Sequence, residues 1–387
     1  MLKETGRAFP RGKTAIVSTG TFGFGEAPGY SSVELAAQAS LNALAQVGLK
    51  PSDVDAVFGN LRGGNFAGLQ LAEYFGINPK LTSSNNMGGS SFEAHVLWAA
   101  LALEARQCDV VLIAYGSNLK TGVGRMIGAD GSHYEAPYKA RRPLSGYALA
   151  AARHMHQYGT TRRQLGEVAV AARKWAQLNP EAVMRAPLTI DEVLAARMVA
   201  DPLTTRDCCL VTDGAGAIVM MRADKARDLV ARPAYVLGAA EATDHLAISS
   251  MPDLTITPAA TSGPRAFAQA GYGPNDMSVV QLYDAFTINT ILFLEDLGFC
   301  PKGEGGRFVE DGAIAPGGKL AVNTNGGGLS CVHPGMYGMF LLVEATRQLM
   351  GQAGERQIKD AKLAVAHGNG VELSSQATVI LGADETL

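Results

Sequence analysis

Side chains that could carry chemistry gather in one glycine-rich stretch of the sequence, residues 323–340. The stretch reads NTNGGGLSCVHPGMYGMF, and an apolar run with helical character follows it through Leu349. Its glycine cluster and its possible reactive side chains are Gly326, Gly327, Gly328, Cys331, His333 and Tyr337. Glycines let a backbone approach a ligand closely, and a helix that starts nearby points free N–H groups and the positive end of its dipole into the same space. The pattern therefore predicts a site that stabilises a developing oxyanion.

Each reactive side chain also has a purely structural interpretation. His333 stands in a His-Pro-Gly loop, where it is either an oxyanion donor or a turn histidine. Cys331 lies two residues from His333, but residues two apart seldom face each other and most free cysteines are inert, so a Cys–His nucleophile is the weaker interpretation. Tyr283, at the end of an apolar strand, and Tyr337, on the first turn of the expected helix, are either core aromatics or catalytic phenols.

The end of a later apolar run offers further polar groups. His367 ends a strand that we expect to be buried, and Asn369 and Gly370 then turn the chain. A histidine in this place is as readily a satisfied loop residue as a catalytic one.

The mouth of an early apolar helix carries two serines. The spacing Ser90-x-x-Glu93 is a capping-box pattern, in which a hydroxyl and a carboxylate satisfy the free N–H groups of the first turn. The pattern therefore favours Ser90 or Ser91 as a cap over either as a nucleophile.

These groups are held by alternating predicted strands and helices, which favour an α/β fold. The first half has strands near residues 14–18, 54–58, 109–115 and 211–221, and helices near 32–47 and 90–106. The second half repeats this order, because residues 274–283, 323–328 and 364–370 mirror residues 51–58, 85–90 and 113–118. We therefore predict a duplicated α/β lobe with halves at 1–232 and 233–387, and a covering excursion at about 117–206.

Composition narrows the classes of function. The chain has 387 residues, 47% of them hydrophobic and 18% charged, and a net charge of -3, which excludes a disordered protein and gives no sign of a basic nucleic-acid face. The beginning of the sequence has no apolar leader, and no run reaches the roughly 18 apolar residues that a membrane helix needs, so we expect a cytoplasmic protein with no membrane association. Five scattered cysteines predict neither a disulfide framework nor a metal site.

Several long strings resemble one known family. Residues 147–217, with HMHQYG, RKWAQLNP and DPLTTRDCCLVTDGAGA, resemble the sterol-carrier-type branch of the thiolases, and YDAFTINTILFLEDLGFC, KGEGGRF and NTNGGGLSCVHPG resemble the lipid-transfer proteins within that branch. The resemblance covers nearly the whole chain. It implies the thiolase fold, a five-layered α/β/α/β/α subunit that is usually dimeric and binds acyl-CoA thioesters.

The departures from this family concern its chemistry. Thiolases place a nucleophilic cysteine at the start of the helix that opens near Ser90, and a second cysteine in a loop that corresponds to residues 367–370, and both are absent here. The oxyanion-hole His-Pro survives as His333-Pro334, whereas the Asn-Glu-Ala-Phe motif becomes Tyr-Asp-Ala-Phe, beginning at Tyr283. A serine without an adjacent base is a poor substitute for a thiolate, so acyl transfer through a covalent intermediate is disfavoured.

The sequence is most similar to the thiolase-like aldolases that shorten steroid side chains. That resemblance implies retro-aldol cleavage of a bulky β-hydroxyacyl-CoA into a ketone and a short acyl-CoA, with Tyr283 and Tyr337 moving protons and His333 beside them. The implied pocket residues are Gly327, Gly328, Ser90, His367, Asn369 and Gly370. The resemblance also implies a companion subunit of zinc-ribbon and OB-fold type beside a homodimer, and no cofactor other than the coenzyme A of the substrate. The alternatives are an atypical thiolase that uses Cys331, and a non-catalytic subunit that binds acyl-CoA or lipid.

Overall fold

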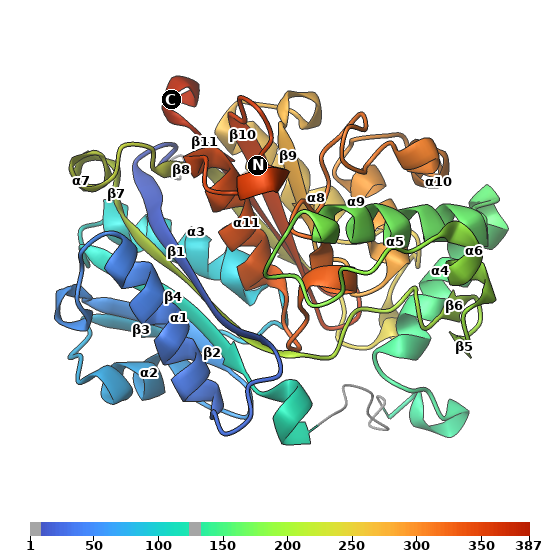
Figure 1. Cartoon of the computed structure of the whole chain (residues 1–387), viewed down its shortest axis with the longest axis horizontal. Coiled ribbons are helices and arrows are strands. Elements are labelled where there is room, and N and C mark those ends of the chain that lie inside the picture. The colour runs from blue at the N-terminus through green and yellow to red at the C-terminus, as the bar shows by residue number, and fades with distance from the viewer. Residues whose placement is uncertain (1–8, 124–132) are drawn as a thin grey trace, which may run out of the picture.

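The computed structural model describes residues 9–123 and 133–387, so the first eight residues of the chain and residues 124–132 of the expected covering excursion lie outside the described residues. A mixed sheet of nine strands runs through the molecule in the order β3-β2-β4-β7-β1-β8-β11-β10-β9 (Figure 1). The strands of the first half are β1 (Thr14–Gly25), β2 (Ala56–Leu61), β3 (Leu81–Ser83), β4 (Val110–Ser117) and β7 (Asp213–Arg222). Those of the second half are β8 (Ala234–Thr243), β9 (Val279–Leu282), β10 (Leu363–Gly370) and β11 (Ser375–Gly382).

The sheet is two half sheets joined at a narrow seam. Strand β1 pairs with β8 at two positions, where Ala15 faces Tyr235 and Ile16 faces Ala234. Outward from this seam, both halves have two antiparallel pairings followed by a parallel one, β1-β7-β4-β2 in the first and β8-β11-β10-β9 in the second. A parallel bridge between Val280 and Val322 in the second half takes the place of β3 in the first. The duplicated architecture predicted from the sequence is therefore confirmed, while the division at residue 232 stays a prediction.

Helices complete a five-layered arrangement (Figure 1). Helices α1 (Ser32–Gln46) and α2 (Ala67–Phe75) cover one face of the first half sheet, and α8 (Ala259–Ala270) covers the second half sheet, with α9 (Thr287–Asp296) beside it. Helices α3 (Ser91–Glu104) and α11 (Gly338–Met350) pack on each other and on strands of both halves, so they form the central layer. Short helices α7 (Ala223–Leu229) and α10 (Gly305–Phe308) lie at the periphery.

The covering excursion packs against the second half of the molecule. It contains α4 (Leu144–Tyr158), α5 (Arg162–Gln177), α6 (Ile190–Ala195) and a small hairpin of β5 (Met198–Ala200) and β6 (Leu203–Thr204). Helices α4 and α5 contact α9, and α5 also contacts the turn Gly327–Cys331. The excursion thus covers the glycine-rich stretch.

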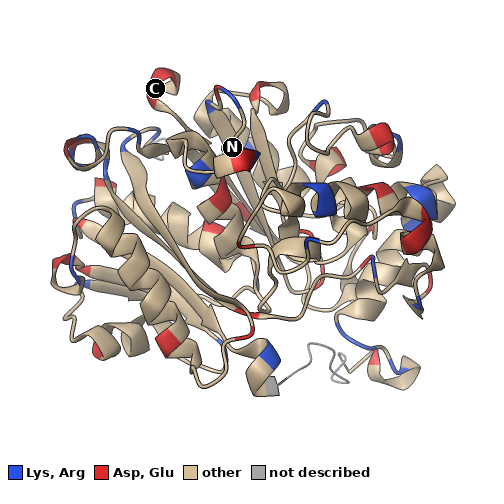
Figure 2. Ribbon diagram, in the orientation of Figure 1, with Lys and Arg blue, Asp and Glu red and all other residues tan. Residues whose placement is uncertain are grey.

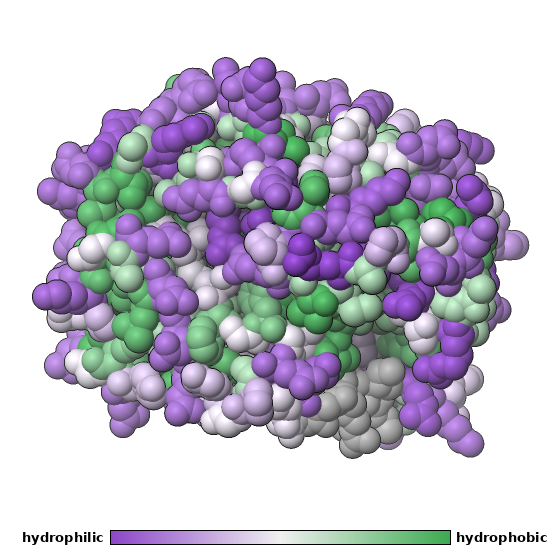
Figure 3. Space-filling view, viewed as in Figure 1, coloured by the Kyte–Doolittle hydropathy of each residue, from purple (hydrophilic) through white to green (hydrophobic). Residues whose placement is uncertain are grey.

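The surface mixes charged and apolar groups. Figure 2 shows acidic and basic residues interspersed along the outer loops and helices. Figure 3 shows apolar side chains over α1 and the adjoining strands, between hydrophilic groups. Within the ranges 9–123 and 133–387, every helix is too short or too polar to cross a membrane.

The start of α1 forms a capping box, whereas the start of α3 does not. At α1 the Ser31 hydroxyl accepts the backbone N–H of Glu34, whose carboxylate accepts the N–H of Ser31, a device worth about 1 kcal/mol. At α3 the predicted capping box is wrong, because Ser90 has helical dihedral angles and makes no capping hydrogen bond. Packing explains the difference, since Ser90 and Glu93 are fully buried between the two halves, whereas Ser31 is at the surface.

Candidate active site

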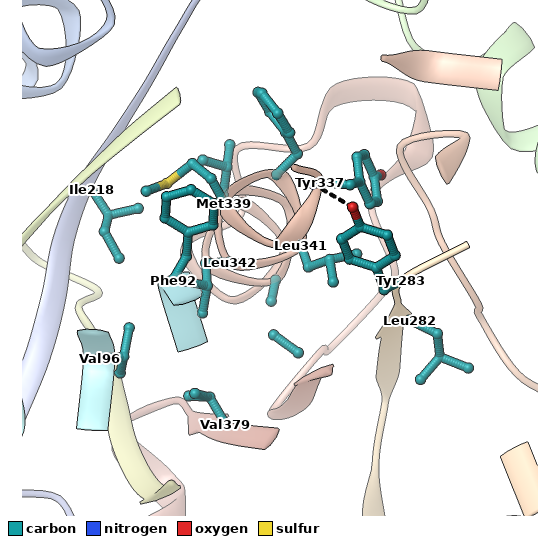
Figure 4. Close-up of a cluster of buried hydrophobic side chains, with 14 of the residues drawn as sticks. Phe92, Val96, Ile218, Leu282, Tyr283, Tyr337, Met339, Leu341, Leu342 and Val379 are labelled. Atoms are coloured by element: carbon teal, nitrogen blue, oxygen red, sulfur yellow. Dashed lines mark hydrogen bonds between the residues drawn. The ribbon is translucent and has the colours of Figure 1, made fainter. Parts of the chain in front are cut away.

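Three aromatic rings meet where β9, the glycine-rich stretch and α11 converge. Tyr283 directly follows β9, and its ring lies edge-on to both His333 and Tyr337, with centroids 5.6 Å and 5.8 Å away. His333 and Tyr337 are stacked at 6.0 Å. The backbone N–H of Tyr337, at the start of α11, donates a 3.1 Å hydrogen bond to the Tyr283 hydroxyl (Figure 4). The structure thus brings together the three side chains that the sequence singled out.

A cavity of about 440 Å³ opens beside this cluster. Tyr283, His333 and Asn369 contribute polar groups to its wall, and Tyr147 and Phe286 contribute apolar surface. The ring of Tyr147, which comes from the covering excursion, is stacked on Phe286 at 4.4 Å. A concave, mostly apolar site with a few convergent polar groups is typical of small-molecule binding.

Tyr337 lies behind this wall rather than on it. Its side chain is fully buried, and its hydroxyl donates a 2.8 Å hydrogen bond to the side-chain oxygen of Asn325. Burial, with the nearby carboxylate of Asp284, raises the pKa of Tyr337 well above its ordinary value. Of the two predicted tyrosines, the cavity is therefore lined by Tyr283.

Burial sets the resting protonation state of Tyr283. A base near neutral pH needs a lowered phenol pKa, but burial raises the pKa of Tyr283 well above 10. The Tyr337 N–H at the helix terminus acts in the expected direction, yet it is outweighed. Tyr283 is therefore a neutral phenol at rest.

His333 is held as a neutral imidazole on the cavity wall. Burial lowers its pKa to about 4, and within the described residues neither ring nitrogen has a hydrogen-bond partner. The Tyr115 hydroxyl, on β4, secures the following residues by donating to the carbonyl of Pro334 (2.5 Å) and accepting from the N–H of Met336 (3.1 Å). A neutral imidazole with a free N–H can donate to a substrate oxyanion.

The glycine cluster binds an internal carboxylate instead of lining the cavity. The N–H of Gly328 donates to Asp284 Oδ1 at 2.6 Å, and the N–H of Leu329 donates to Oδ2 at 3.4 Å. A Cβ on Gly327, whose φ is +67°, would lie 1.9 Å from the same carboxylate, so a side chain has no room there. Burial raises the pKa of Asp284 to about 7. The anion that the glycine pattern indicated is thus the protein's own Asp284.

Of the remaining predicted pocket residues, some line the cavity and others lie behind its wall. Asn369 is on the wall, whereas both ring nitrogens of the buried His367 are occupied, Nδ1 by Thr378 and Nε2 by Gln376, each at 2.9 Å. The structure therefore supports the interpretation of His367 as a residue whose hydrogen bonds are satisfied within the protein, rather than as a catalytic one. Gly370 lets two loops touch, since a Cβ there would lie 1.6 Å from the Met87 carbonyl oxygen.

Ser90 is also withdrawn from the cavity. Its hydroxyl donates to the carbonyl of Met87 at 3.0 Å and accepts from the hydroxyl of Ser375, 2.9 Å away, and the residue is fully buried. It makes neither the cap nor the contact with a base that a nucleophile needs.

None of the five cysteines, all of which are described, lies on the cavity wall. Cys331 is buried, and burial raises its pKa well above the ordinary thiol value, so the thiolate that acyl transfer requires is disfavoured. Asn179 donates to its sulfur at 3.5 Å. The geometry leaves Tyr283 and His333 as the reactive groups of the cavity.

Sequence reasoning missed two residues of this site, Tyr147 and Asn325. Tyr147 belongs to the covering excursion, where its burial against Phe286 depends on a contact between segments far apart in the chain. Asn325 begins the glycine cluster and holds the Tyr337 hydroxyl. Asn325 could have been found from its position directly before the glycine cluster, but only the glycines of that motif were assigned a role.

Known proteins are similar to this chain over most of its length. Residues 240–383 match the family described as Thiolase C-terminal domain-like. The chain is 37% identical to the 17-hydroxy-3-oxo-4-pregnene-20-carboxyl-CoA lyase of Mycobacterium tuberculosis, over 96% of this chain and 99% of that protein. It is 34% identical to the acetyl-CoA acetyltransferase of Methanothermobacter thermautotrophicus, over 92% of this chain and 96% of that protein.

A solved structure is similar over its full length. The structure titled Ltp2-ChsH2(DUF35) aldolase superposes with a TM-score of 0.90 and 34% sequence identity, covering 98% of this chain and 100% of that one. The similarities to both relatives and to this structure span nearly all of the present chain. The chain therefore belongs to the thiolase family, in the sterol-carrier-type branch that includes the steroid side-chain-cleaving aldolases.

Proposed function

We propose that this protein is a carbon–carbon lyase that cleaves a bulky, steroid-type β-hydroxyacyl-CoA into a ketone and a short acyl-CoA. The observation that carries the proposal is a cavity lined by a phenol and a neutral imidazole, without a thiol. Two similar proteins bear matching names, the pregnene-carboxyl-CoA lyase of Mycobacterium tuberculosis and the steroid side-chain-cleaving aldolase of Thermomonospora curvata.

The chemistry requires two proton transfers and one place for negative charge. Because Tyr283 rests as a neutral phenol, its oxygen takes the β-hydroxyl proton as its own proton leaves toward the α carbon. In the same step the bond between the α and β carbons breaks, and negative charge develops on the thioester oxygen. The His333 N–H donates to that oxygen. The proton of Tyr283 passes to the α carbon, so the phenol ends the cycle as it began and no outside proton is consumed. Tyr337 supports this exchange through its backbone N–H, and its own hydroxyl is the second candidate proton carrier.

The cavity and its mouth favour an acyl group with a large apolar body. The wall includes Tyr147, Phe286 and Val371, and the neighbouring Leu246 is 75% exposed. Arg142 ties this rim together by donating to the carbonyl of Leu246 and pairing with Glu372. An exposed apolar rim beside an apolar cavity fits a ligand that is partly held outside it.

The test is an assay for the two products. The full chain, supplied with its companion subunit where activity requires it, is incubated with a steroid β-hydroxyacyl-CoA, and ketone and short acyl-CoA are measured by mass spectrometry. We expect cleavage without free CoA and without acylation of the protein.

An acyltransferase is the second candidate, favoured by the similarity to the acetyl-CoA acetyltransferase. CoA-dependent cleavage of a 3-ketoacyl-CoA, with stoichiometric labelling of a cysteine, would select it. Tight binding of acyl-CoA with no turnover would select a non-catalytic binding subunit.

We also propose a homodimer formed at the edge of the first half sheet. Among the described residues, strand β3 pairs with β2 alone, and exposed aromatic and aliphatic side chains lie at α2, which contacts β3, and on α3, which contacts β2. They are Phe66, Leu69, Tyr74, Trp98 and Leu101. An open strand edge with apolar flanks is a ready surface for pairing with a second copy. Trp98→Glu should convert the dimer into a monomer in analytical ultracentrifugation, and a wild-type monomer at micromolar concentration would contradict this arrangement.

A companion subunit of zinc-ribbon and OB-fold type completes the proposed assembly. The support is the similar structure titled as an Ltp2-ChsH2(DUF35) aldolase, whose title names two components. We place the protein in the cytoplasm because its five cysteines are all free, as a reducing compartment keeps them. Cell fractionation followed by co-purification checks both statements.

A further inference from the structure

A continuous chain of buried hydrogen bonds runs behind the cavity wall, from β11 through β10 to the covering excursion. The Thr378 hydroxyl meets His367 Nδ1 at 2.9 Å, and His367 Nε2 meets Gln376 Oε1 at 2.9 Å. Gln376 Nε2 donates to Asn369 Oδ1 at 2.7 Å, and Asn369 Nδ2 donates to the Tyr147 hydroxyl at 2.8 Å. Of these residues, Asn369 and Tyr147 line the cavity, and His367 and Gln376 do not.

The direction of this chain is set at its last member. The Tyr147 hydroxyl donates to the carbonyl of Val371 at 3.0 Å, and a carbonyl can only accept. The single proton of Tyr147 is therefore used there, so its oxygen must accept the N–H from Asn369. Asn369 Oδ1 must then accept from Gln376.

The same logic assigns the protonation of His367. Gln376 Oε1 accepts, so His367 Nε2 must carry a proton. His367 is neutral near pH 7, because burial lowers its pKa to about 3, and its Nδ1 therefore accepts from the Thr378 hydroxyl. Thr378 in turn meets the hydroxyl of Ser262 at 2.9 Å, and such hydroxyls rotate to suit either direction. The donors and acceptors in this series of hydrogen bonds are compatible in one arrangement only, in which each group donates to the next one toward the cavity.

The consequence concerns what Asn369 presents to a ligand. Its side-chain oxygen is held by Gln376, and one of its two N–H bonds is held by Tyr147. The second N–H is the polar group that this residue has left, and a donor is what an enolate oxygen requires.

We propose that His367 and Gln376 are positioning residues that orient the Asn369 amide, so that its free N–H donates to the thioester oxygen as negative charge develops there. The inference rests on the proposed function, and it adds a second donor to His333. Neither positioning residue touches the substrate.

The experiment compares variants that keep the size of a side chain in this series of hydrogen bonds but change which of its atoms can donate or accept. Gln376→Glu at pH 8 still accepts from His367, but its carboxylate cannot donate to Asn369. Asn369→Asp removes the donor itself, which should lower kcat by about 10²-fold, as loss of one oxyanion-hole donor does. We expect Gln376→Glu to lower kcat by a smaller factor, about tenfold, with KM little changed, because the donor is present but no longer oriented.

A matched pair of substitutions at His367 separates positioning from structure. His367→Gln can place an N–H near the position of Nε2, so it should retain activity, whereas His367→Leu cannot and should lose it. Ser262→Ala is the control, because it removes a hydroxyl at the far end of the chain without changing the direction. Thermal unfolding of each variant reports folding.

A second readout separates this inference from the proposed function. Transfer of deuterium from D2O into the α position of propionyl-CoA measures enolate formation without cleavage, since protonation of the enolate is reversible. We expect the wild type to catalyse this exchange, His367→Gln to retain it, and Gln376→Glu to reduce it. Wild-type rates of exchange and cleavage in a folded Gln376→Glu would overturn the inference, and if His367→Leu fails to fold, Gln376→Glu decides. A wild type that exchanges the α proton but cleaves no β-hydroxyacyl-CoA would instead overturn the proposed function.

Discussion

Each half of this molecule contains a polar segment that leads from the edge of its sheet into a helix of the central layer. The two segments differ in length and in the side chains that they carry. In the first half, residues 84–90 lead from β3 directly into α3. In the second half, the much longer segment 323–337 leads from the equivalent bridge at Val322 into α11. Both helices lie in the central layer, yet the cavity takes its phenol and imidazole from the second half. Duplication therefore supplied the scaffold, and the reactive groups come from two segments of the second half, the loop after β9 and the longer connection.

The shorter connection contributes Asn86, Gly88 and Gly89 to the cavity wall but no phenol or imidazole, and it packs closely against the second half. Gly89 is required because a Cβ there would lie 2.0 Å from the ring of Tyr283. Glu93, one helical turn further on, is buried against the other half, and neither of its carboxylate oxygens has a hydrogen-bond partner among the described residues. In contrast, the carboxylate of Asp284 in the second half is held by two backbone N–H groups. The first copy supplies part of the cavity wall and packs against the site, and the second copy supplies its phenol and imidazole.

The strongest test of this contrast is Tyr283→Phe. The substitution removes the hydroxyl on the cavity wall and keeps the ring against Gly89, so the fold should persist while turnover falls by about 10²–10⁴-fold, the usual contribution of one acid–base group. Steady-state cleavage of a β-hydroxyacyl-CoA measures the change. Tyr272→Phe is the control, because that hydroxyl donates to the carbonyl of Thr386 away from the cavity. Equal rates for Tyr283→Phe and wild type would contradict the assignment.

His333 should have the next largest effect. His333→Ala removes a donor to the developing oxyanion and should lower kcat by about 10²–10³-fold. Because burial lowers the His333 pKa to about 4, the imidazole stays neutral down to that pH and becomes charged below it. The pH–rate profile should therefore show no inflection from this histidine near its ordinary pKa of about 6.5. An inflection there that disappears in His333→Ala would refute the neutral-donor assignment.

The sequence was informative wherever a pattern was repeated or chemically specific. Three echoes between the halves predicted the duplication, and the order of strands about the seam confirms it. The residue types of Tyr283, His333 and Asn369 also indicated polar groups that the structure places on one cavity wall.

The errors arose where a local pattern was overruled by packing across the two halves. The capping box at Ser90 failed because that helix start is buried. The glycine cluster was expected to receive a substrate oxyanion, but it receives Asp284, which comes from a loop more than forty residues earlier. Likewise, no local signal shows that the Tyr337 hydroxyl points toward Asn325. Such choices depend on which segments meet in the folded chain.

Glu93, in the first turn of α3, should affect stability more than activity, and Glu93→Gln tests this. Burial raises the Glu93 pKa well above 4.5, so the folded state binds its proton more tightly than the unfolded state. That stabilisation is complete below the unfolded pKa and is lost as pH rises from 4.5 through the folded pKa, at about 1.4 kcal/mol per pH unit. Denaturant unfolding at several pH values should show this decline in the wild type and a flatter curve in Glu93→Gln. Glu104→Gln, at the exposed end of the same helix, is the control.

Ser90→Ala should have the smallest effect. The substitution removes the hydrogen bonds to Met87 and Ser375, which should cost about 1 kcal/mol of unfolding free energy. Activity should be nearly unchanged, because the hydroxyl is absent from the cavity wall and has no base beside it. The comparison to make is with Tyr283→Phe in the same cleavage assay. If the two variants lost activity to the same extent, Ser90 would have retained the catalytic place that the family gives to its cysteine, and the separation of scaffold from chemistry between the two halves would fail.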